Sequence, residues 1–151
     1  MGLKLYLPLG VAAFLAGTSG ADIMARMSIG GEPLAAAVDG HLAMVAGMQP
    51  VAAILLLAPF MIVTGICARA ERRARRRSVL AVFAAATGVL LICYFIAHRD
   101  AHEALRAARW TAAALAIGLV PWTAGVPVAL LTWGAAAIAA RLDPRPSADS
   151  G

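Results

Sequence analysis

Four long stretches without a charged residue limit what this chain can fold into. They run from Leu5 to Ala21, from Leu42 to Ala68, from Ser78 to Ala97 and from Trp110 to Ala140. A membrane-spanning helix needs about 20 apolar residues, within a range of about 17 to 25. The last three stretches are long enough, and none suffices for two passes. Because lipid offers no hydrogen-bond partners to the backbone, each stretch is expected to be helical.

The composition excludes a soluble domain. The 151 residues are 62% hydrophobic and 14% charged, whereas a soluble domain is about half apolar and about a quarter charged. A small globule cannot hide that much apolar surface. We therefore predict an all-α membrane protein, a bundle of four transmembrane helices in a single domain over residues 1–142, with a disordered cytoplasmic tail at 143–151. The predicted spans cover residues 4–21, 50–68, 78–97 and 111–140.

The first stretch has a second interpretation. Lys4 and the apolar run at residues 5–16 resemble the start of a signal peptide, and residues 19–21 (Ser-Gly-Ala) fit its cleavage site. Cleavage would leave three spans. The single charge and the early position of Pro8 favour an uncleaved helix.

The basic residues predict the orientation. Six arginines fall in the nine residues from Arg69 to Arg77, and basic loops stay on the cytoplasmic side of a membrane. Both termini are then cytoplasmic, which places nine basic residues inside and four outside. The Arg and Ala bias is typical of a GC-rich bacterial genome, so we expect a bacterial inner (plasma) membrane. The loop is also expected to contact anionic lipid headgroups through Arg69, Arg72, Arg73, Arg75, Arg76 and Arg77.

The segment after the first stretch is expected to lie outside. Asp22 and Arg26 are four residues apart and are expected to pair on one helical turn. Gly30 and Gly31 predict a break, and Pro33 then fits the start of another helix. Residues 33–48 either lie in the membrane interface or extend the second span.

The fourth stretch is too long for a straight span. Its 31 residues would cover roughly 46 Å as a helix, against about 30 Å of hydrocarbon. The segment from Pro121 to Pro127 predicts a kink or an unwound turn. Trp110 and Trp133 fit the aromatic belts at the two interfaces, and Trp122 is expected to face a neighbouring helix or a cavity.

Two groups of residues have side chains that suit metal ions. His98 and His102 share a helical face, and His41 leads a stripe with Met44 and Met48 at helical spacing. Imidazole suits copper or zinc, and thioethers suit Cu(I). The same residues also fit a hydrated helix end and an apolar packing stripe.

No nucleophile–base pair, phosphate loop or carboxylate dyad occurs, so the sequence does not indicate an enzyme. Alanine and glycine are abundant in every span, which is typical of closely packed membrane helices. We expect a non-catalytic accessory or scaffold component that packs with itself or with a partner membrane protein, as a homo- or hetero-oligomer. The alternative is a small transporter or metal-handling protein that uses the outer His and Met residues. Basic residues without interleaved aromatics do not favour nucleic acid.

The orientation has a direct test. A reporter that works only in the cytoplasm should be active when fused after Arg77 or after Gly151, because the arginine-rich loop is held inside. A reporter that works only outside the cytoplasm should be active when fused at Gly30. Alkaline phosphatase and green fluorescent protein activities provide the two readouts. A cytoplasmic signal at Gly30 would contradict the assignment.

Overall fold

The computed structural model describes residues 2–144 and confirms the predicted fold class. It is 88% helical with no strand among those residues, and four of its helical units are long and apolar enough to cross a membrane. Residues 145–151, most of the predicted tail, lie outside the described residues. Three of the elements are π-helical, with turns wider than those of an α-helix. In chain order the elements are α1 (Gly2–Leu15), η1 (Ala16–Gly20), α2 (Ala21–Ala25), η2 (Arg26–Gly30), α3 (Leu34–Ala46), α4 (Pro50–Ala70), α5 (Arg76–Arg106), α6 (Trp110–Gly118), η3 (Pro121–Gly125) and α7 (Val126–Leu142).

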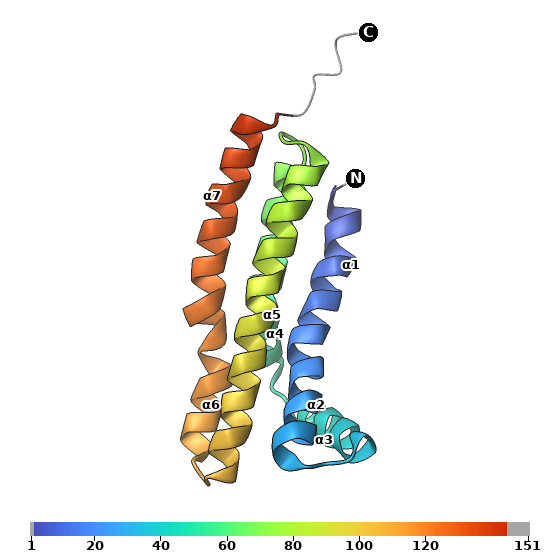
Figure 1. The fold of residues 1–151 in the computed structure, drawn as a ribbon, viewed down its shortest axis with the longest axis vertical. Coiled ribbons are helices and arrows are strands. Elements are labelled where there is room, and N and C mark those ends of the chain that lie inside the picture. Colours follow the sequence, from blue (N-terminus) through green and yellow to red (C-terminus); the bar gives the residue numbers. More distant parts are fainter. Residues whose placement is uncertain (1, 145–151) are drawn as a thin grey trace.

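Figure 1 shows the long helices standing side by side, with α3 lying across one end of them. The start of α1, the loop between α4 and α5 and the end of α7 share the opposite end. We call this opposite end the arginine end, since it carries the arginine-rich loop at 71–75 together with Lys4. The end covered by α3 is the histidine end, since all three histidines of the chain lie there.

The helices run further than the uncharged stretches. The first candidate span continues to Gly30 and the third to Arg106, so each adds charged turns at the histidine end. The predicted break is present, because Gly31 adopts a left-handed backbone with φ of 70°. Since α3 ends at Ala46 and α4 begins at Pro50, the segment at 33–48 does not extend the second span.

The core lies where α1, α4 and α5 meet. The rings of Tyr6 and Phe83 pack edge to face with centroids 5.1 Å apart, and those of Phe60 and Tyr94 do so at 5.2 Å. The Tyr94 hydroxyl donates a hydrogen bond of 2.7 Å to the Leu56 carbonyl. These rings fix the relative depth of the three helices, because edge-to-face pairs add specific geometry to apolar burial.

Small residues set how closely the helices approach. A Cβ on Gly10 would overlap the Thr64 hydroxyl, so α1 lies directly against α4. A Cβ on Gly125 would come within 2.5 Å of the Pro59 ring, so η3 lies equally close to α4. Close approach at small residues is how membrane helices gain packing energy without a hydrophobic driving force.

The fourth span breaks where the sequence predicts. The helix α6 ends at Gly118, and the wide turn η3 begins at Pro121 and ends at Gly125, two residues before Pro127. Trp110 and Trp133 are exposed, as expected of residues in aromatic belts. The prediction for Trp122 is wrong, because 59% of this side chain is exposed on the surface of the bundle. The wide turn carries Trp122 outward, so no helix of this chain covers it.

Candidate functional sites at the two ends of the bundle

A buried carboxylate marks the histidine end. Asp22 lies on α2, between the wide turns η1 and η2, and only 1% of its surface is exposed. A carboxylate removed from water is costly unless charged or hydrogen-bonding groups surround it. Its neighbours therefore decide both its stability and its chemistry.

Three side chains hold the Asp22 carboxylate. The Arg26 Nε donates to Oδ2 at 2.8 Å, which confirms the predicted pairing on one helical turn. The His41 ring lies on the same oxygen, with its Nδ1 at 3.0 Å. The His102 Nε2 lies 2.7 Å from the other oxygen, Oδ1. Because an ionised carboxylate only accepts hydrogen bonds, both ring nitrogens must carry the donated proton.

These contacts join elements that are distant in the sequence. His41 comes from α3 and His102 from α5, while Asp22 and Arg26 belong to the first span. The carboxylate thus fastens α3 across the end of the bundle. Arg26 reinforces this position, because it also faces Glu32 at 3.9 Å at the start of the segment leading into α3.

The third histidine completes the cluster without a hydrogen bond. His98 on α5 is 3% exposed, and its Nδ1 lies 3.9 Å from Asp22 Oδ1. Neither of its ring nitrogens has a hydrogen-bond partner among residues 2–144. Buried polar groups are nearly always hydrogen-bonded, so His98 departs from the usual pattern of a packed imidazole.

The structure brings together three of the five metal ligands that the sequence suggests. His41, His98 and His102 all face Asp22, a residue that the sequence analysis treated only as a partner of Arg26. Met48 instead packs against the main apolar core, and Met44 is half-buried on α3. The sequence feature that could have identified Asp22 is its spacing of four residues from Arg26. This spacing indicates that the first helix continues beyond the uncharged stretch.

The side chains at the histidine end that could bind a metal ion already bond to one another. Imidazole and carboxylate atoms already meet at hydrogen-bond distance, and the Arg26 guanidinium places a positive charge against the same carboxylate. Among the described residues, no group of three or more His, Cys, Asp or Glu side chains has an arrangement that could hold a metal ion. A cation would have to displace these hydrogen bonds.

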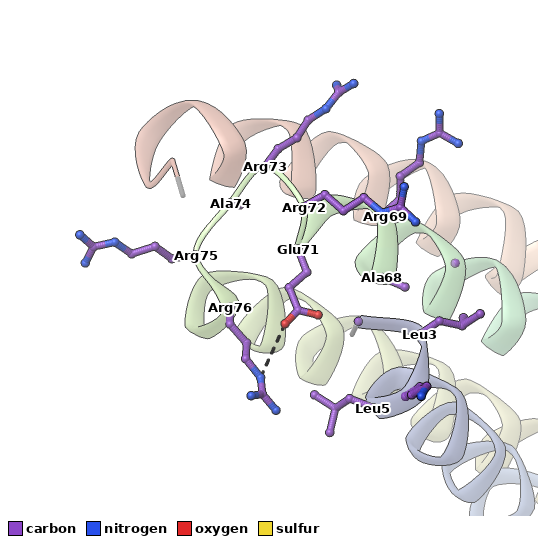
Figure 2. A pocket seen from close by; sticks show the side chains of 13 residues that line it. Leu3, Leu5, Ala68, Arg69, Glu71, Arg72, Arg73, Ala74, Arg75 and Arg76 are labelled. Carbon is purple, nitrogen blue, oxygen red and sulfur yellow. Dashed lines mark ion pairs between the residues drawn. The ribbon is translucent and has the colours of Figure 1, made fainter. Parts of the chain in front are cut away.

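The arginine end carries an open groove. Its volume is about 1590 Å³, and it lies between the start of α1, the end of α4 and the loop that follows. Figure 2 shows Glu71 reaching toward Arg76, while Arg75 points away on the other side of the loop. The lining is strongly basic and comprises Gly2, Leu3, Lys4, Leu5, Gly65, Ala68, Arg69, Glu71, Arg72, Arg73, Ala74, Arg75 and Arg76.

Asp143, at the end of α7, anchors the arginine-rich loop. Its carboxylate meets the Arg75 Nε at 3.1 Å and the Arg77 Nε at 3.7 Å. Its carbonyl accepts a hydrogen bond of 2.9 Å from the Arg75 backbone amide. Arg76 pairs with Glu71 at 3.7 Å. These two acids engage half of the six arginines and hold the loop against the bundle.

Comparison with known proteins gives no relative from which a role could be carried over. No family model, curated protein or solved structure matches this chain. The two clusters of charged residues are therefore interpreted on their geometry alone.

Removing the buried carboxylate tests whether it fastens the histidine end. Asp22→Ala should lower the free energy of unfolding by about 3–5 kcal/mol, because it removes the acceptor that Arg26, His41 and His102 share. Asp39→Ala is the matched control, since Asp39 is exposed on α3 and its loss should change stability by about 0.5 kcal/mol or less. Unfolding in detergent, followed by circular dichroism, measures both. Equal effects of the two substitutions would contradict the assignment.

Proposed function

We propose that this chain is a small multi-pass protein of a bacterial inner membrane and serves as a non-catalytic accessory or scaffold component. In this role it packs with itself or with a partner membrane protein through helix faces that its own fold leaves uncovered. The proposal places both termini in the cytoplasm. It is supported by the shared position of the basic groups and by one outward-facing stripe on the fourth span.

The basic groups support the orientation because most of them gather at one end of the bundle, while Arg26, Arg99, Arg106 and Arg109 lie toward the other. Lys4 lines the same groove as the arginines of the loop. The loop in turn contacts the end of α7, where Ala74 forms an isolated bridge with Pro144. A single arginine end on the cytoplasmic side agrees with the rule that basic residues stay inside.

The observation that carries the proposed role is a stripe of small residues between two exposed tryptophans. Trp110, Ala114 and Gly118 follow one another at intervals of four on α6, and Trp122 comes four residues later in η3. All four are exposed, and a Cβ added to Gly118 would meet no atom within 4 Å. Small residues at this spacing let a second helix approach closely, and the tryptophans would border it with large apolar surfaces.

Filling the stripe tests the proposed packing role. Gly118→Leu should weaken self-association, or association with a co-purifying membrane protein, by roughly tenfold or more because the side chain blocks close approach. Gly134→Leu is the control, since Gly134 lies on the same span and also has open space beside it. Single-molecule photobleaching and crosslinking in native vesicles measure the association. A wild-type protein that is strictly monomeric and co-isolates with nothing would contradict the proposal.

A second candidate function is metal handling or transport at the histidine end. The convergence of His41, His98 and His102 on Asp22 favours it, and the buried, unpaired imidazole of His98 supplies an available donor. Copper or zinc would be the expected ions, because imidazole ligands suit both. Two observations weigh against this function: the Arg26 charge lies beside the carboxylate, and among residues 2–144 no group of three or more of these side chains is arranged to hold a metal ion.

Calorimetric titration with zinc and with Cu(I) distinguishes this second function. If it holds, the purified protein binds one of these ions at micromolar concentration, and His98→Ala/His102→Ala abolishes binding because it removes two imidazoles from the cluster. Met44→Ala/Met48→Ala should retain zinc binding, since Met48 packs in the apolar core. Absence of binding by the wild-type protein at micromolar metal would eliminate this function.

A further inference from the structure

The groove at the arginine end lies where two helices are in direct contact. A Cβ on Gly2 would come within 2.6 Å of the Glu71 carboxylate and within 2.9 Å of the Ala68 carbonyl, so α1 begins directly against the end of α4. Gly2 and Ala68 both line the groove, so this contact forms part of its wall. Gly65, one turn before Ala68, has open space beside it, which leaves the groove accessible along α4. The cavity is therefore built by the contact of two helices and is more than a rough surface.

The positive charges around the groove are unevenly compensated. Arg75 and Arg77 share Asp143, and Arg76 pairs with Glu71. Among residues 2–144, no described ion pair involves the other four cations that line the groove. These four cations share the lining with Glu71, and they are Lys4, Arg69, Arg72 and Arg73.

The lining has an apolar side as well as a basic one. Leu3 and Leu5 come from the first turns of α1, and Ala68 comes from the last turns of α4. Leu3 is 57% exposed, and it lies in the first turn of a helix that is apolar enough to cross a membrane. A ligand that fills the groove would need an anionic group for the cations and hydrocarbon for these apolar side chains.

We propose that the groove is a binding site for one anionic phospholipid. Lys4, Arg69 and Arg72 hold its phosphate group, and its acyl chains lie against Leu3 and Leu5 on the membrane side. Arginine binds phosphate oxygens in a bidentate manner, and lysine adds a point charge. The site is independent of the proposed packing role, because it lies on α1 and α4 and the small-residue stripe lies on α6.

This inference differs from the lipid contact that the sequence predicts. The sequence treats all six arginines as equivalent and assigns no part to Lys4. In the structure Arg77 does not line the groove and faces Asp143, whereas Lys4 lines it from another helix. A discrete site therefore predicts that charges of equal sign at the same end will have unequal effects on lipid binding.

Paired variants with the same change in charge provide the test. Arg69→Gln/Arg72→Gln should reduce the affinity for phosphatidylglycerol by about tenfold or more. Arg77→Gln/Arg141→Gln removes two charges from the same end, outside the groove, and should change affinity by about twofold or less. Native mass spectrometry of purified protein in detergent, titrated with phosphatidylglycerol or phosphatidylcholine, measures binding independently of membrane insertion. Equal losses in the two variants would overturn the proposal, because they would indicate diffuse attraction only.

Two further arms make the result decisive. Lys4→Gln, a change at an exposed residue near the start of α1, should also weaken phosphatidylglycerol binding if the site is discrete, and an unchanged affinity would contradict it.

The second experiment is a competition, in which inorganic phosphate and glycerol phosphate are added at millimolar concentration. Little displacement supports a lipid ligand, because the acyl chains contribute to binding. Full displacement, or equal binding of phosphatidylcholine, would overturn the assignment to an anionic lipid. Unchanged unfolding midpoints of the variants confirm that the fold is intact.

Discussion

A carboxylate that is taken out of water must be surrounded by donors, and the histidine end is organised around this requirement. Asp22 obtains its donors from its own helix, from α3 and from α5. The short helix α3 is apolar and too short to be one of the candidate spans. Its position across the end of the bundle therefore depends on the polar contact of His41 as well as on packing. Charged groups inside membrane proteins are rare and usually serve a role, and here the described contacts already give one, the joining of three elements.

The two ends of the bundle balance charge in opposite ways. At the histidine end a single carboxylate is shared by Arg26 and two imidazoles, so most of the polar atoms are satisfied within the protein. At the arginine end two acids engage three arginines, and further cations remain open to the surroundings. The first end is closed and determines shape. The second end is open and has the character of a surface that binds anions.

The helices were predictable because lipid solvation imposes a simple rule on sequence. Long uncharged stretches must be helical, and glycine or proline pairs mark breaks, so the turn at Gly31 and the interruption after Pro121 follow from local chemistry. The cluster at Asp22 was less accessible. Its pairing with Arg26 is local, but His41 and His102 lie 19 and 80 residues away, and only the packing of helices brings them together. Trp122 was misplaced for a related reason, since helical rotation after a wide turn is not encoded by spacing alone.

The wide turns on either side of Asp22 have a consequence for how this segment tolerates change in length. A π-helical turn is commonly an α-helix that has accepted one extra residue. Deleting one residue from η1 would therefore return this turn to the α-helical form, and the residues that follow would keep their side of the helix. Asp22 would still face His41 and His102, so residues 16–20 can lose one residue while the buried carboxylate keeps its position.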